Sequence, residues 1–237
     1  MDYYHFLKDR FSNGVFNGDK TRPSAVKHAY ADMSRRATGH TAALRDNCIA
    51  WLSEEVFRNL PEIRSQDEFD KWHEDTCAAL KERHGTFGKI GRSQKVINMA
   101  FKYLSCVDDT YDPILPYCHM TLDGYTLRWY KTINKNWKAI EWSKIDSYDE
   151  YMAIQKTIRQ HLKNGAIYSI AIEDKKTREI ELPKLPFEAE FIIWEGEIIN
   201  ARYNNLIKEL RNYASSWTEK DHWLIGDLFD QFLSDFR

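Results

Sequence analysis

The sequence lacks the features that mark membrane, secreted and metal-binding proteins. No run of about 18 apolar residues is present, and the first residues do not form a secretory signal, so we expect a cytoplasmic protein. The four cysteines show no C-x-x-C spacing, which argues against a zinc or iron–sulfur site and against a disulfide framework. We therefore expect buried thiols in a reducing compartment, no metal and no cofactor.

The sequence also lacks a large excess of either acidic or basic residues. The formal net charge is −2 at pH 7, which excludes binding to nucleic acid by bulk charge alone but leaves room for a local basic patch. No Walker loop, H-E-x-x-H or G-x-S-x-G motif is present, and no internal repeat. Hydrophobic residues make up 43% of the 237 residues, which is ample for a core. We expect a monomer whose residues 1–237 form one helical domain of two lobes.

Apolar residues spaced three and four apart predict a mainly α protein. Capping boxes at Ser65–Glu68 and Ser147–Glu150 mark two helix starts. Other helices are expected over 2–11, 24–37, 41–60, 187–213 and 218–233. Only residues 166–182 show the alternation of strands, and they predict one β-hairpin that turns at Asp174–Thr177.

The stretch from Gly85 to Leu127 carries the residues of most interest. Gly88 and Gly91 come just before an apolar helical run, where glycine permits a tight turn and the close approach of another backbone. The first amides of a helix are unpaired donors that suit a phosphate. Further donors are supplied at the same place by the side chains of Arg92, Ser93, Gln94 and Lys95.

Asp123 lies between Leu122 and Gly124, at the start of a second short apolar helix. One interpretation is structural, because a carboxylate at this position caps the helix and interacts well with its dipole. The other is catalytic, because a carboxylate can stabilise a developing positive charge or activate water. The two interpretations are compatible, since a capping position fixes the side chain.

The pattern Gly-x-x-Gly-Arg-x-x-Lys, followed by hydrophobic-Asp-small-hydrophobic, resembles the helix-hairpin-helix DNA glycosylases over roughly residues 85–130. The resemblance implies that a hairpin at Phe87–Gln94 grips a DNA phosphate and that Asp123 serves cleavage of the sugar–base bond. In some members a lysine on the hairpin helix, here Lys95, is the nucleophile. The interval from Lys95 to Asp123 is longer than is usual in the family, which implies an insertion around 108–116.

The predicted function is therefore excision of a modified base from double-stranded DNA, leaving an abasic site. Because Arg92, Lys95 and Lys102 share one helix face, we expect a phosphate track there and no strand cleavage by Lys95. The family's four-cysteine iron–sulfur pattern is absent. This departure favours the family's bacterial defence branch, which removes sugar-modified cytosines from phage DNA.

A base that is flipped out of the DNA stack must be held between flat side chains. The aromatic residues around Asp123 predict such a pocket from Tyr117, His119 and Trp129. A cluster of basic residues upstream predicts phosphate contacts by Arg35 and Arg36.

Two alternatives remain open at this point. The same hairpin occurs in proteins that bind DNA without catalysis, so the chain could be a binding module. The spacing R-x4-H from Arg35 to His40 is also that of the HEPN ribonucleases, which predicts RNA cleavage that depends on His40.

Overall fold

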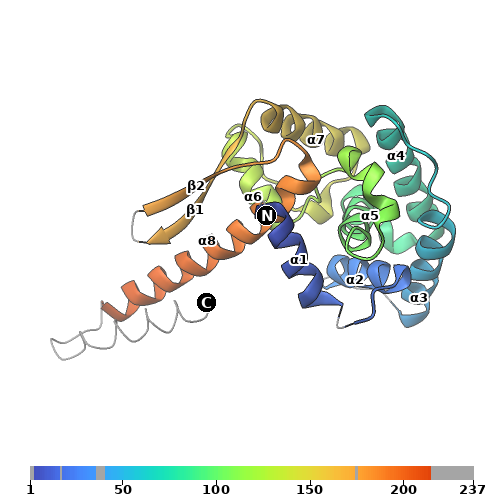
Figure 1. Cartoon of the computed structure of the whole chain (residues 1–237), viewed down its shortest axis with the longest axis horizontal. Helices are drawn as coiled ribbons and strands as arrows, with labels where there is room; N and C mark the ends of the chain where they lie inside the picture. The colour runs from blue at the N-terminus through green and yellow to red at the C-terminus, as the bar shows by residue number, and fades with distance from the viewer. Residues whose placement is uncertain (1–2, 17, 36–40, 174–175, 215–237) are drawn as a thin grey trace.

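Helices dominate the computed structural model, which describes residues 3–16, 18–35, 41–173 and 176–214 (Figure 1). The α-helices are α1 (Tyr3–Val15), α2 (Arg22–Ser34), α3 (Ala42–Trp51), α4 (Gln66–Arg83), α5 (Ile90–Leu104), α6 (Gly124–Ile133), α7 (Tyr148–Lys163) and α8 (Pro186–Ala214). Shorter turns are η1 (Leu52–Val56), η2 (Gly85–Phe87), η3 (Asp109–Tyr117) and η4 (Trp142–Lys144). The prediction of a mainly α protein is confirmed. Within these ranges, no helix is both long and apolar enough to cross a membrane.

Local sequence signals set the helix starts. Ser65 accepts a hydrogen bond from the amide of Glu68 (3.2 Å), and Ser147 accepts one from the amide of Glu150 (3.0 Å), as capping residues do. The helix predicted over 41–60 is confirmed in its first part, because α3 passes into the π-helical turn η1. The helix predicted over 218–233 lies outside the described residues.

The one predicted hairpin is also confirmed. Strands β1 (Ile167–Glu173) and β2 (Lys176–Glu181) are antiparallel, with Ile167 opposite Glu181. The hairpin and the second half of α8 project together from the body of the protein (Figure 1). Tyr168 of β1 packs directly on Gly196 of α8, where a Cβ would lie 2.1 Å from the tyrosine ring. Glycine at 196 therefore lets the hairpin lie against the helix.

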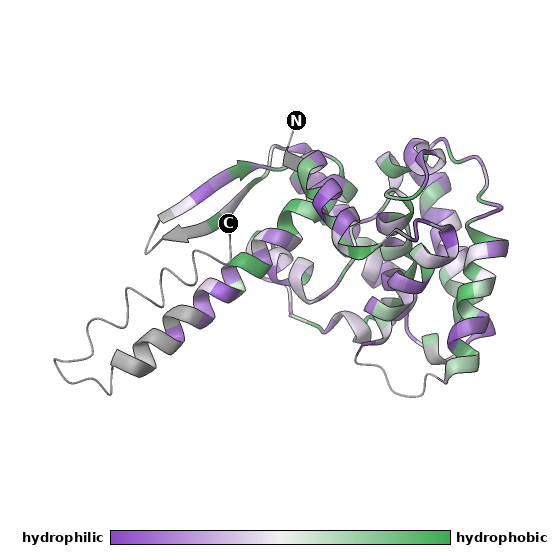
Figure 2. Cartoon of the chain, turned by 60° about the horizontal axis from the view of Figure 1, so that its bottom comes forward, coloured by the Kyte–Doolittle hydropathy of each residue, from purple (hydrophilic) through white to green (hydrophobic). Residues whose placement is uncertain are grey.

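Helix α5 is the centre of the core. Twelve of its fifteen residues are buried, including the predicted apolar stripe of Val96, Ile97, Ala100, Phe101 and Leu104. Helices α2 and α4 and the turn η4 pack around it. In the rest of the body, hydrophobic and hydrophilic residues alternate along the helices, as expected where one side is buried (Figure 2). Because most of α5 is buried, its polar side chains need hydrogen-bond partners inside the protein.

The N-terminus of α5 is covered by the segment 141–145. The amide of Gly91 donates to the carbonyl of Ile145 (3.0 Å), and a Cβ on Gly91 would lie 1.7 Å from the carbonyl oxygen of Trp142. The close approach of backbone that the glycine permits is therefore an approach by the protein's own chain.

We predict that Gly91→Ala destabilises the fold by about 1–3 kcal/mol, because the new methyl group must push the Trp142 carbonyl away. Urea unfolding measures the effect. Gly124→Ala is the matched control, since no atom lies within 4 Å of a Cβ there and the residue also begins a helix. Equal stability of Gly91→Ala and wild type would contradict this packing.

Candidate functional site

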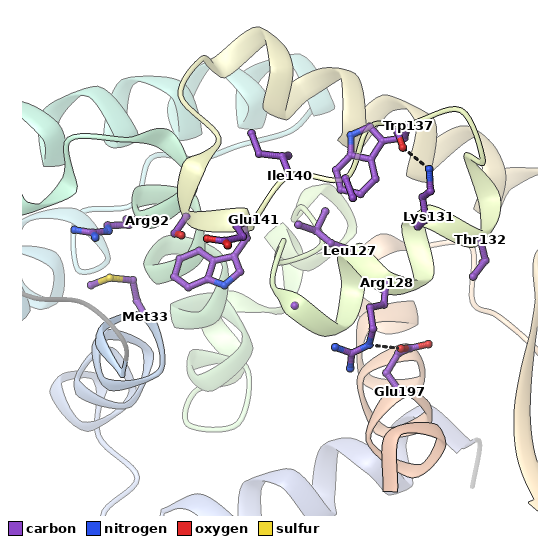
Figure 3. A pocket seen from close by; sticks show the side chains of 14 residues that line it. Met33, Arg92, Leu127, Arg128, Lys131, Thr132, Trp137, Ile140, Glu141 and Glu197 are labelled. Atoms are coloured by element: carbon purple, nitrogen blue, oxygen red, sulfur yellow. Dashed lines mark hydrogen bonds and ion pairs between the residues drawn. The ribbon is translucent and has the colours of Figure 1, made fainter. Parts of the chain in front are cut away.

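A cleft of about 860 Å³ opens between α6 and the segment 137–143 (Figure 3). Five elements contribute to its walls: α2, α5, α6, the segment 137–143 and α8. The side chains at the cleft include the aromatic residues Trp137 and Trp142, the cations Arg92, Arg128 and Lys131, and the carboxylates Glu141 and Glu197. The cleft thus combines flat aromatic surface with charges of both signs.

Polar contacts hold the walls of the cleft in place. The guanidinium of Arg128 pairs with Glu197 (3.0 Å) and lies 4.6 Å from the ring centre of Tyr125. The ammonium of Lys131 donates to the carbonyls of Lys135 (2.7 Å) and Trp137, which fixes the turn that carries Trp137. Arg92 lies at the opposite end of the cleft (Figure 3). A cationic side chain therefore lies at each end of the cleft.

Asp123 caps α6 and directly precedes Gly124, which lines the cleft. Its Oδ1 accepts hydrogen bonds from the amides of Tyr125 (2.8 Å) and Thr126 (3.0 Å), and Thr126 returns a bond to the amide of Asp123 (2.9 Å). The predicted capping role is confirmed. The residue is 7% exposed, and its Oδ2 has no hydrogen-bond partner in the described part of the chain. The capping bonds thus engage Oδ1 and leave Oδ2 without a hydrogen bond.

The side chain of Lys95 extends from α5 to Trp142. Its ammonium lies 4.3 Å from the ring centre of Trp142, which also lines the cleft. Burial lowers the pKa of Lys95, and the negative charges of Asp123 and Asp32 act against that shift. No direct ion pair joins Lys95 to Asp123, but the charge of each acts on the other. The two predicted catalytic side chains are therefore close enough for the charge of Asp123 to act on Lys95.

The predicted track of three cations on α5 does not form. Lys102 is buried, and its ammonium pairs with Glu190 of α8 (3.2 Å). Aromatic rings surround it, with the ring centre of Phe191 at 4.4 Å and that of Trp194 at 5.1 Å. Lys102 lies seven residues after Lys95 and so on the same side of α5, but near the end of the helix that side faces the core. Lys102 therefore has no access to a phosphate.

The predicted phosphate grip at Phe87–Gln94 is largely internal. The side chains of Phe87, Ser93 and Gln94 are buried, and the amide of Gly91 already donates to Ile145. These groups are occupied within the protein: Ile145 takes the Gly91 amide, the ring of Phe87 packs against that of Tyr30, and the amide of Gln94 bonds Leu122. Among the predicted contacts of the hairpin, Gly88 is exposed and Arg92 is half-buried at the cleft.

The upstream basic residues are only partly described. Arg35 is exposed and pairs with Asp32. Arg36 and His40 lie outside the described residues, and so do the predicted phosphate contact of Arg36 and the second residue of the R-x4-H pair.

The predicted base-pocket residues lie away from the cleft. His119 is buried, with Nδ1 2.7 Å from the hydroxyl of Tyr151 and Nε2 2.7 Å from Asp70. Trp129 is buried and packs edge-on against the ring of His161. Tyr117 donates to the carbonyl of Arg64 (2.8 Å).

The aromatic residues at the cleft are Trp137 and Trp142 instead. They belong to the aromatic stretch that follows Thr126, but they lie in a connection without helical or strand periodicity. Their sequence therefore gives no indication of the direction they face. The one signal in the sequence that could have suggested a surface role for them is that they follow the basic residues of α6.

No group of three His, Cys, Asp or Glu side chains is arranged as metal ligands in the described ranges. Comparisons of the chain with protein-family models, with curated proteins and with solved structures found no match.

The buried histidine gives a prediction for pH dependence. Burial lowers the pKa of His119 to about 4, against 6.5 for a free histidine. Between these values the unfolded chain binds a proton that the folded chain does not, so stability falls as the pH drops from 6.5 towards 4. The slope of unfolding free energy against pH approaches about 1.4 kcal/mol per pH unit for each such histidine.

We predict that His119→Gln makes this slope shallower by the contribution of about one proton. Urea unfolding between pH 7 and 5 measures it, and equal slopes in the two proteins would contradict the burial of a neutral imidazole.

Proposed function

We propose that this protein is a DNA N-glycosylase of the helix-hairpin-helix type, with α5 and α6 as the helices that carry its chemistry. The observation that supports the proposal best is the position of Asp123. Its carboxylate is fixed by helix amides one residue before Gly124, which lines the cleft, and Lys95 is close enough for the charge of Asp123 to act on it. The capping bonds hold one oxygen and leave the other free, which is a suitable arrangement for a carboxylate that acts on a bound substrate.

The proposed reaction is hydrolysis of the bond between a base and its sugar. As this bond lengthens, positive charge grows on the sugar, and the Asp123 carboxylate stabilises it. The base leaves with the electrons of the broken bond, and water adds to C1′ of the sugar while its proton passes to Asp123 Oδ2. That proton then passes through solvent to the released base anion, which restores the carboxylate. The product is an intact strand with an abasic site.

The cleft suits a flipped base with a bulky substituent. Trp137 and Trp142 offer flat faces for stacking, which an enzyme that acts on a base requires. The volume of about 860 Å³ is near the upper end of the range for small-molecule sites, about 300–1,000 Å³, and exceeds the needs of an unmodified base. Glu141 and Glu197 add hydrogen-bond acceptors for hydroxyl groups. We propose sugar-modified cytosine in phage DNA as the substrate, and antiviral defence as the role.

A non-catalytic hairpin module is less well supported. Such a module would grip a phosphate through the first amides of α5, and the amide of Gly91 is already bonded to Ile145. We propose that DNA phosphates instead meet Arg92, which is half-buried at the cleft, and the exposed Arg35. With a net charge of −2, this binding depends on local charge and should weaken as salt is raised.

We predict that Asp123→Asn lowers the single-turnover rate of base excision by about 100-fold or more, because the carboxylate takes part in the chemical step. Asparagine also caps helices, so folding and DNA affinity should be kept. Abasic sites are measured by alkali cleavage of duplexes that contain sugar-modified, oxidised, alkylated or ordinary bases.

The matched control is Asp108→Asn. Asp108 also caps a helical turn, where its side chain accepts from the amide of Thr110 (2.9 Å), but it does not line the cleft. Its rate should equal that of wild type. Excision that persists in Asp123→Asn, with both variants folded, would contradict the role of this carboxylate. Excision from other modified duplexes but never from sugar-modified cytosine would contradict the proposed substrate.

Lys95 is proposed to remain a cation and to assist Asp123 without attacking the sugar. The Trp142 ring and the nearby carboxylates favour the charged form, although burial opposes it. We therefore predict that borohydride traps no protein–DNA adduct and that Lys95→Gln retains much of its excision activity. A trapped adduct that disappears in Lys95→Gln would instead identify Lys95 as the nucleophile.

A further inference from the structure

The chain enters α6 through a buried segment of extended backbone, residues 118–122, which belongs to no sheet. Its backbone groups are too deep for water, so they need partners from the protein. Side chains of three helices supply them: Gln155 of α7 donates to the carbonyl of Met120 (2.8 Å), Glu190 of α8 accepts from the amide of Thr121 (2.7 Å), and Gln94 of α5 bonds both groups of Leu122.

Gln94 makes the fullest set of bonds among these three. Its Nε2 donates to the carbonyls of Leu122 (2.8 Å) and Gly91 (2.9 Å). Its Oε1 accepts from the amide of Leu122 (3.1 Å) and from Nδ2 of Asn98 (3.1 Å). A side-chain amide has two donor hydrogens and two acceptor lone pairs, and all four are used here. The amide of Gln94 therefore has one orientation and holds Leu122 from both sides.

A chain of buried bonds keeps Gln94 in this orientation. Nδ2 of Asn98, besides its bond to Gln94, donates to the hydroxyl of Tyr151 (2.9 Å). The Asp70 carboxylate can only accept, so the neutral His119 carries its proton on Nε2, and its Nδ1 accepts from Tyr151. Each donor in this series thus has a defined direction, and the amide of Gln94 cannot rotate without breaking several bonds.

This bonding joins two pairs of neighbouring residues. Gln94 precedes Lys95 on α5, and Leu122 precedes Asp123 at the start of α6. Thr126 closes the arrangement, because its hydroxyl donates to the carbonyl of Thr121 (2.6 Å) and accepts from the amide of Asp123. A shift of Leu122 relative to Gln94 would therefore move Asp123 relative to Lys95.

We infer that Gln94 is a positioning residue, which sets the place of the Asp123 carboxylate relative to Lys95 and the cleft through its two bonds to Leu122. The consequence for catalysis rests on the proposed function. The sequence pattern suggests a contact with phosphate for Gln94, but its buried amide acts within the protein.

The test replaces Gln94 by methionine, which has a similar length but no hydrogen-bonding amide. Gln155→Met is the matched control, since Gln155 is also fully buried and donates to the same segment, two residues before Leu122. Both variants lose buried hydrogen bonds and should melt at lower temperature than wild type. Gln94→Met should lower the single-turnover excision rate by about 100-fold with DNA affinity unchanged, because a displaced catalytic group costs rate rather than binding. Gln155→Met should keep the wild-type rate.

A second measurement needs no substrate. Titration of ¹³C-methylated lysines by NMR reports the pKa of Lys95, which the charge of Asp123 raises. Asp123→Asn should lower this pKa, Gln94→Met should shift it in the same direction, and Gln155→Met should leave it unchanged. If Gln94→Met does not fold, Gln94→Asn, which keeps the amide but shortens its reach, takes its place.

Each outcome decides the inference. Equal excision rates and equal Lys95 titration in folded Gln94→Met and wild type would overturn it. Loss of rate in Gln155→Met to the same extent would show a general loss of packing, which would also overturn it. Should the wild-type protein excise no base from any duplex, the proposed function fails, and the Lys95 titration still decides whether Gln94 places Asp123.

Discussion

The structure depends on how buried backbone between η3 and α6 obtains its hydrogen bonds. A segment of extended chain that enters a helical core has no neighbouring strand, and each unpaired amide or carbonyl there would cost about 1–3 kcal/mol. The protein meets this constraint with polar side chains on α5, α7 and α8. That solution explains why the central helix of the core carries buried glutamine and asparagine as well as leucine and phenylalanine.

The same constraint connects the core to the cleft. Asp123 is the first residue after the segment 118–122, and its position is fixed by hydrogen bonds within the protein, which would suit the catalytic role proposed for it. Catalytic groups gain most when neighbouring bonds hold them in advance, because little freedom is then lost during the reaction. The buried pair of Lys102 and Glu190 supports the segment from its other side, since Glu190 also accepts from the amide of Thr121.

The features that could be predicted correctly from the sequence are those set by residues close together in the chain. Helix caps at Ser65 and Ser147, the hairpin over 166–182 and the capping position of Asp123 depend on residues a few positions apart, and the structure contains all of them. The predictions failed where a residue's partner is distant in sequence. Lys102 pairs with a carboxylate 88 positions away, and His119 bonds Asp70 at a separation of 49. Neither separation leaves a periodic pattern, so a surface cation and a pocket aromatic were expected where the structure has core residues.

Gly91 shows how one sequence feature can serve two different structures. A glycine at a helix start permits close approach of a phosphate or of backbone, and the sequence alone does not distinguish them. Here the carbonyl of Ile145 takes the amide, and Trp142 is carried to the side of Lys95 as a result. The segment 141–145, which covers the start of α5, therefore also supplies Trp142 to the wall of the cleft.

In the proposed binding mode, a flipped base enters the cleft between α6 and the segment 137–143 and presents its sugar to Asp123. A crystal structure of Asp123→Asn bound to a duplex with one sugar-modified cytosine tests this binding mode most directly. We predict an extrahelical base against Trp137 and Trp142, with C1′ of its sugar next to residue 123. A base that remains stacked in the duplex, or DNA bound on a face that leaves the cleft empty, would contradict it.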